Sequence, residues 1–112
     1  MKAQRIEAGR YIIEVGARRW LARRVPCKID PRWRLYTEGF TCVLETLRAC
    51  KAMAHELTLA AQRGWRVEPV GASGMRLIRH HVTILPWHGW AAVGPLGEPI
   101  KHASSLVELL DL

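Results

Sequence analysis

Residues 11–25, YIIEVGARRWLARRV, consist of two runs rich in β-forming residues on either side of Gly16 and Ala17. Glycine at the first central position favours a two-residue type II′ turn, so the stretch predicts a β-hairpin. Because side chains alternate along a strand, this turn decides which of them share a face. The predicted faces carry Tyr11, Ile13, Val15, Trp20 and Ala22 on one side, and Glu14, Arg19, Leu21 and Arg23 on the other.

A third strand is predicted over residues 32–37, after a connector that contains Pro26 and Pro31. Proline lacks the N–H group that a central strand donates, so the two prolines end strand pairing on either side of the connector. Alternation along the third strand places Trp33 and Leu35 on one face. The other face carries the polar set Arg32, Arg34 and Tyr36.

One long helix is predicted over residues 46–63. Thr46 is a suitable N-cap residue, and Gly64 is typical of a helix end. Apolar residues recur at spacings of three and four, which gives a continuous stripe able to lie across a sheet. The stripe consists of Leu47, Cys50, Ala54, Leu57 and Ala61.

The rest of the chain is again rich in β-forming residues. Residues 75–85 fit either one long strand or two, and Ser105 and Glu108 have the spacing of a capping box that opens a short helix. The other predicted strands are residues 65–70, 90–93 and 98–101. The predicted fold class is therefore α+β, an antiparallel sheet with one long helix packed on it and a short C-terminal helix.

The two halves of the chain share a pattern of strands followed by a helix. Trp33 precedes the cap residue Thr46 much as Trp90 precedes Ser105, with a glycine between them in each case. This pattern fits two strand–strand–helix repeats, and it also fits any β-hairpin followed by a capped helix. By length the chain is expected to be a single domain over residues 1–112.

The positive charge is concentrated in the first half of the chain. The formal net charge is +7, and residues 1–40 contain ten Lys and Arg against four Asp and Glu. Within the single domain, residues 1–64 are thus basic, whereas residues 65–112 contain four residues of each sign and are neutral. Such an asymmetry indicates that one surface meets a polyanion.

Cysteine usage and the lack of long apolar runs predict a soluble, cytoplasmic protein. Cys27, Cys42 and Cys50 are odd in number and lack CxxC spacing, which is typical of free thiols in a reducing compartment. No apolar run approaches the length of a membrane span, and residues 1–10 lack the apolar core of a secretion signal. We therefore expect no membrane partner.

The basic face suits nucleic acid, because Lys and Arg neutralise phosphates and release counterions. Nearby Tyr or Trp rings would stack on unpaired bases. The alternative is an ordinary solvated face, since outward strand positions must be polar and arginine on an edge strand opposes aggregation. The predicted binding surface, for DNA, RNA or an acidic host protein, comprises Arg18, Arg19, Arg23, Arg24, Lys28, Arg32, Arg34 and Tyr36.

Residues 10–63 also carry a set of short motifs: the pair Arg18 and Arg19, then WLA at residues 20–22, Gly39 before Thr46, and an alanine-rich helix start. In these motifs the segment resembles the three-stranded-sheet-plus-helix DNA-binding domains of plant ethylene-response factors and of the arm-binding domains of phage integrases. Small phage and mobile-element proteins often share these features. The resemblance implies that the sheet enters the major groove while the helix packs behind it.

No set of residues predicts catalysis, a cofactor or a metal site. The histidines and cysteines do not form the closely spaced ligand pairs of structural zinc. Ser73 has the surroundings of a turn residue, and Asp30, Glu38 and Glu45 are irregularly spaced acids. We therefore expect a protein that is not an enzyme.

Trp87 and Trp90 flank a turn and form a candidate protein interface. Alternatively, these tryptophans cap the end of a small hydrophobic core. Arg and Trp are typical interface anchors. The second hypothesis is therefore a small phage- or plasmid-encoded inhibitor, of the anti-CRISPR or another anti-defence type, that binds a host protein complex.

Overall fold

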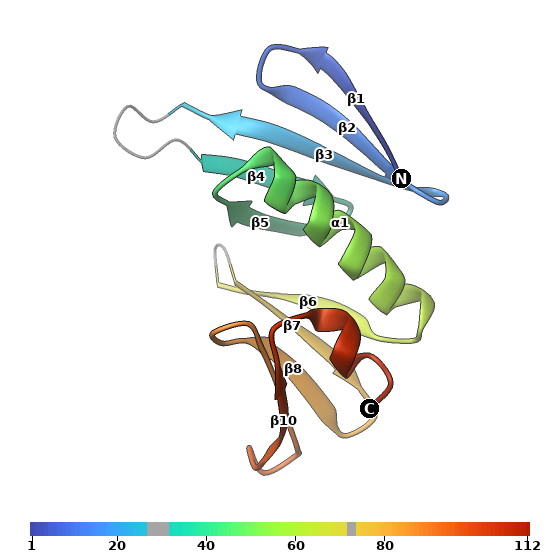
Figure 1. The fold of residues 1–112 in the computed structure, drawn as a ribbon, viewed down its shortest axis with the longest axis vertical. Coiled ribbons are helices and arrows are strands. Elements are labelled where there is room, and N and C mark those ends of the chain that lie inside the picture. The colour runs from blue at the N-terminus through green and yellow to red at the C-terminus, as the bar shows by residue number, and fades with distance from the viewer. Residues whose placement is uncertain (27–31, 72–73) are drawn as a thin grey trace. The chain divides into compact units, whose positions relative to one another are not determined.

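The computed structural model describes residues 1–26, 32–71 and 74–112. The described chain forms two compact units, Met1–Thr58 and Leu59–Leu112, and each contains one five-stranded antiparallel sheet (Figure 1). The predicted α+β class is confirmed, although the sequence predicted one sheet where the structure has two. The single domain over residues 1–112 stays a prediction, and the units are described separately.

The first sheet is a meander in which each strand pairs with the next along the chain. Gly16 has a φ of +59°, the positive value that a type II′ turn requires. The predicted register is confirmed, with Val15 opposite Arg18 and Ile13 opposite Trp20. The strands are β1 (Lys2–Glu7), β2 (Arg10–Val15), β3 (Arg18–Val25), β4 (Arg32–Thr37) and β5 (Phe40–Leu44).

The core of the first unit lies on one face of this sheet, which we call the inner face. Ile13, Trp20 and Leu35 are buried there. The indole N–H of Trp20 donates a hydrogen bond of 3.0 Å to the hydroxyl of Thr58 on the long helix, α1 (Leu47–Gln62). The inner face is therefore the helix-covered side of the sheet, and the opposite side is called the outer face.

The sequence did not predict β1 or β5. All six residues of β1 are exposed, so this edge strand has no buried face to produce an alternating apolar pattern. In β5, Phe40 and Cys42 are buried and do alternate, but the strand has only five residues between a glycine turn and the helix cap. Both strands form because a neighbouring strand supplies hydrogen-bond partners, which local sequence does not reveal.

The long helix begins and ends close to the predicted limits. The Oγ1 atom of Thr46 accepts a hydrogen bond of 3.0 Å from the backbone N–H of Ala49, which confirms the N-cap. Gly64, with a φ of +87°, ends the helix in the left-handed conformation. The predicted apolar stripe is buried at its centre, at Cys50 and Leu57.

The second sheet is also a meander. The predicted segment 75–85 divides into two strands, joined by a turn at His80 and His81. His80 and His81 therefore lie in a turn and not within a strand. The strands are β6 (Arg66–Val70), β7 (Gly74–Arg79), β8 (Val82–Pro86), β9 (Trp90–Val93) and β10 (Pro99–Ala103).

The predicted C-terminal helix is a single 3-10 turn, η1 (Leu106–Leu109). The backbone N–H of Ser105 donates to the carboxylate of Glu108 at 3.3 Å, as the capping-box spacing predicts. Each unit therefore contains a five-strand meander, followed along the chain by a capped helical segment. In the part of the chain that the structure describes, no helix is long and apolar enough to cross a membrane.

Candidate functional site

Three arginines lie side by side on the outer face of the first sheet. The strand register places Arg10 of β2 directly opposite Arg23 of β3, and Arg23 directly opposite Arg34 of β4. We call these three residues the arginine row. Side chains alternate between the two faces along each strand. The neighbours of the three arginines along their strands, Tyr11, Ala22 and Leu35, face inward, so the arginines face outward.

The charges of the arginine row are only partly compensated. Arg10 forms an ion pair of 3.1 Å with Glu7. Among the described residues, neither Arg23 nor Arg34 has a carboxylate within ion-pair distance. Like charges directly opposite each other destabilise a sheet, so the row has a cost that an anion would remove.

A further cation, Arg19, lies on the outer face two rows away from the arginine row. The guanidinium of Arg19 is 3.7 Å from the carboxylate of Glu14, which stands directly opposite it on β2. The Arg19 side chain is 75% exposed, so this pair is well solvated and leaves the arginine free to exchange partners. Arg19 is thus a solvated cation on the outer face.

Between Arg19 and the arginine row, the outer face carries half-buried residues with apolar surface. Ile12, Leu21 and Tyr36 are neighbours on three successive strands. Long arginine side chains can cover apolar surface of this kind while their guanidinium groups reach water. Tyr36 lies on the outer face as the sequence predicted.

A groove opens at the end of the sheet where the β1–β2 turn meets the end of β3. Its volume is about 730 Å³, and its lining is Glu7, Ala8, Gly9, Arg10, Arg23, Arg24 and Pro26. The carbonyl of Gly9 accepts a hydrogen bond of 2.7 Å from the backbone N–H of Arg24, which fixes the turn to β3. Gly9 has a φ of +77°, and a Cβ there would lie 3.3 Å from the Cβ of Arg24. The lining of the groove therefore includes three arginines and one glutamate.

The predicted binding residues separate onto both sides of the sheet. Arg19, Arg23, Arg34 and Tyr36 lie on the outer face, and so does Arg32, which pairs with Val25. Arg18 and Arg24 are the next residues along β3, so alternation turns them to the inner side. The Arg18 guanidinium lies 5.3 Å from the Trp20 ring centroid, a cation–π contact. Lys28 lies outside the described residues, as do Cys27, Asp30 and Ser73.

The sequence interpretation missed Arg10. The signal was present, because Arg10 precedes the inward-facing Tyr11 and the same alternation turns it outward. It was missed because the predicted binding surface begins at Arg18 and follows the chain from there. The neighbours of Arg23 in space are on adjacent strands, so the row is visible only in the register.

The two tryptophans of the predicted interface differ sharply in exposure. Trp90 is 7% exposed and belongs to the core of the second unit, whereas Trp87 is 66% exposed. Trp87 borders a groove of about 590 Å³ between β9 and β10, whose lining includes Ile100 and Lys101. The ring of His102 is 2.9 Å from the Trp87 carbonyl, which fixes the turn that presents the indole.

Metal-ligating and thiol side chains can be located among the described residues. No three of their His, Cys, Asp and Glu side chains are grouped so that they could hold a metal ion. Cys42 and Cys50 are free and buried, and burial raises the pKa of the Cys42 thiol to about 11 and that of Cys50 to about 12. Both thiols stay protonated at neutral pH, and a protonated thiol is a poor nucleophile.

Comparison of the chain with protein-family models, with curated proteins and with solved structures finds no match. The resemblance of residues 10–63 to sheet-based DNA-binding domains therefore stays a prediction. The function is therefore inferred from the residues themselves, beginning with the arginine row.

Proposed function

We propose that the protein binds nucleic acid through the outer face of its first sheet. The observation that carries this proposal is the arginine row, in which Arg23 and Arg34 face each other without a carboxylate among the described residues. Phosphate groups would neutralise these charges, and the release of counterions would drive binding.

The spacing of the row supports a nucleic-acid backbone as the ligand. Neighbouring strands are about 4.8 Å apart, so Arg10 and Arg34 are separated by roughly 10 Å across the sheet. One strand of DNA carries a charge about every 3.4 Å along the helix axis, so several phosphates of a backbone lie within that distance. The row therefore presents three cations to one short stretch of backbone.

The distribution of charge between the units supports the same surface. Residues 1–58 contain twelve Lys and Arg against six Asp and Glu, a net charge of +6, and residues 59–112 contain five against four, a net charge of +1. A surface potential of this kind attracts polyanions to the first unit and raises their rate of association.

Charge reversal on the row tests the proposal. We expect R23E/R34E to abolish binding to fluorescently labelled oligonucleotides, because it turns two contacts into repulsions. The matched control is R66E/K101E, which changes the net charge by the same amount at exposed positions of the second unit. Loss of binding in both variants, or in neither, contradicts the proposal, and circular dichroism shows that each variant is folded.

The second unit supports a second candidate function, binding of a partner protein with an acidic and apolar surface. The observation that favours it is the exposed Trp87 beside a groove with apolar walls, whose charged and titratable lining is Lys101, His88 and His102, without a carboxylate. An inhibitor of a host complex, of the anti-CRISPR or another anti-defence type, would use such a surface. After nuclease treatment, wild type should retain one host complex that W87A releases, and equal retention contradicts this function.

A further inference from the structure

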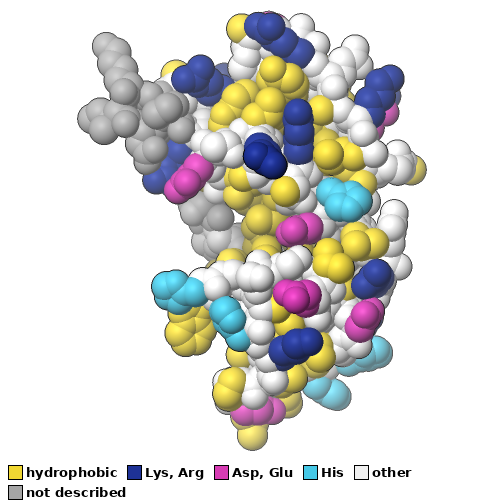
Figure 2. Space-filling model, viewed as in Figure 1, with side chains coloured by type: hydrophobic (Ala, Val, Ile, Leu, Met, Phe, Trp, Pro, Cys, Tyr) yellow, Lys and Arg dark blue, Asp and Glu magenta, His cyan; other side chains and the backbone are white. Residues whose placement is uncertain are grey.

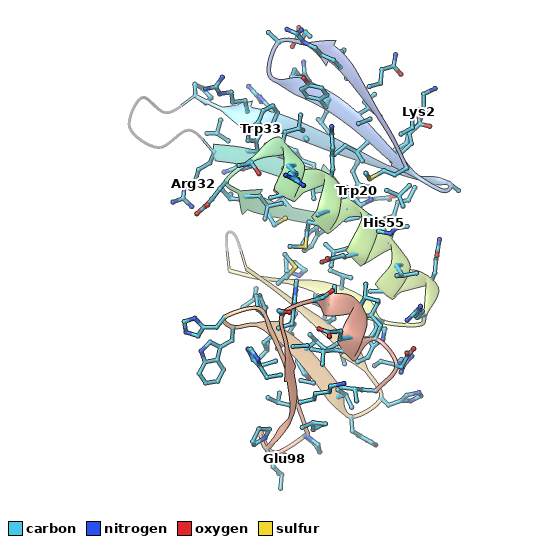
Figure 3. All side chains as sticks on the ribbon, viewed as in Figure 1. Lys2, Trp20, Arg32, Trp33, His55 and Glu98 are labelled. Carbon is cyan, nitrogen blue, oxygen red and sulfur yellow. The ribbon has the colours of Figure 1, made fainter. Side chains whose placement is uncertain are left out.

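An aromatic pair lies on the inner side of the first sheet, near the basic groove. The rings of Tyr11 and Trp33 are 5.9 Å apart between centroids, with their planes inclined at 58°. Trp33, on β4, is labelled in Figure 3. Both residues are half-buried, in contrast to Trp20, which is 2% exposed. The pair therefore presents aromatic surface to water at the border of the core.

The polar ends of the pair have no hydrogen-bond partner in the described part of the chain. The indole N–H of Trp20 is used by Thr58, but among the described residues neither the Tyr11 hydroxyl nor the Trp33 indole N–H forms a hydrogen bond. Buried Tyr and Trp side chains usually find such a partner. These two polar groups are therefore left to water or to a ligand.

Cations flank the aromatic pair. Arg24 stands directly opposite Trp33 on the neighbouring strand, and Arg5 stands directly opposite Tyr11. Among the described residues, neither arginine has an ion-pair partner. On the face of the first unit that Figure 2 shows, hydrophobic side chains are bordered by Lys and Arg.

Arg24 joins the aromatic pair to the basic groove, because it lines the groove together with Arg10 and Arg23. Arg23 and Arg24 are consecutive on β3 and point to opposite sides of the sheet. The pair of Arg24 and Trp33 lies one residue nearer this end of the sheet than the pair of Arg23 and Arg34, and on the opposite face. A polyanion that passes from the arginine row over this end of the sheet therefore meets Arg24 next, and then the ring of Trp33.

We propose that this end of the sheet binds an unpaired nucleotide, with its phosphate in the groove and its base stacked on Trp33 and Tyr11. The inference rests on the proposed function and narrows it to single-stranded nucleic acid. A duplex keeps its bases stacked inside, so it would contact the arginines but not the rings. Stacking on an aromatic side chain strengthens single-strand binding by roughly tenfold per base.

Fluorescence anisotropy of the full chain with a short oligothymidylate and with a duplex of equal length tests this inference. We expect wild type to bind the single strand more tightly. W33L should weaken single-strand binding by roughly tenfold and leave duplex binding unchanged. W33F, which keeps an aromatic ring, should retain most of the affinity. W87L, at the exposed tryptophan of the second unit, should change neither affinity.

A second readout needs no variant. A 2-aminopurine base placed in the single strand should lose fluorescence on binding wild type, because stacking quenches it. Y11L, like W33L, should weaken binding of the single strand. If W33L does not fold, Y11L takes its place in the test.

The inference is overturned if wild type prefers the duplex, if W33L and Y11L bind the single strand as wild type does, or if 2-aminopurine is not quenched. These results would leave the proposed function intact. Failure of the proposed function is a different result, in which R23E/R34E binds both ligands unchanged.

Discussion

The salt dependence of binding gives the sharpest quantitative prediction. The perturbation is R23Q/R34Q, which removes the two row charges that lack a carboxylate partner among the described residues. If Arg19 and the three residues of the arginine row, Arg10, Arg23 and Arg34, each neutralise one phosphate, the logarithm of the binding constant for a single strand falls with a slope of about −2.8 against the logarithm of the salt concentration. Removing two contacts makes the slope less steep, at about −1.4.

These slopes are easy to tell apart. Between about 50 and about 200 mM salt, the wild type should lose roughly 50-fold in affinity and the double variant only about sevenfold. The assay is fluorescence anisotropy with an oligothymidylate at several salt concentrations. R66Q/K101Q is the control, since it also lowers the net charge of +7 by two but on the second unit. An unchanged slope in R23Q/R34Q, or an equal fall in both double variants, refutes the reasoning.

Four further predictions concern the first unit. T58V should lower the free energy of unfolding in urea by about 1–3 kcal/mol, because the buried indole N–H of Trp20 loses its acceptor; an unaltered midpoint would show that the bond is not needed. G9A should cost about 1–2 kcal/mol and weaken oligonucleotide binding, because φ is +77° there, and full stability would contradict this reading of the turn. Iodoacetamide at pH 8 should not label Cys42 or Cys50 in the folded protein, because burial raises both pKa values; peptide mass spectrometry would reveal labelling. Raising the pH from 9 should then lower stability as the unfolded thiols ionise first, and a constant unfolding midpoint would argue against these shifts.

The hairpin and its two faces were predictable because one local feature decides them. The positive φ of Gly16 fixes the turn, and the turn fixes the register of every pair from Val15 and Arg18 outward. A slip of one residue would exchange the two faces, and burial of Trp20 excludes it. The same holds for the helix, whose cap at Thr46 is a local hydrogen bond.

Other features depend on partners that are distant in sequence. β1 is fully exposed and forms only because β2 pairs with it. The split of residues 75–85 at His80 requires a φ of +56°, which histidine adopts less readily than glycine, so the sequence carries no strong turn signal there. The arginine row combines residues from three strands, and Arg10 joins it through the sheet and not through the chain.

Side-chain NMR of the arginines during an oligothymidylate titration tests the central claim most directly. The Nε–Hε resonances report each guanidinium separately, which backbone amides cannot do for two faces of one strand. If the outer face of the first sheet binds nucleic acid, the resonances of Arg23 and Arg34 shift and saturate together, while that of Arg66 on the second unit stays in place. Shifts confined to Arg66 and its neighbours, or no shift at Arg23 and Arg34 at saturation, would contradict it.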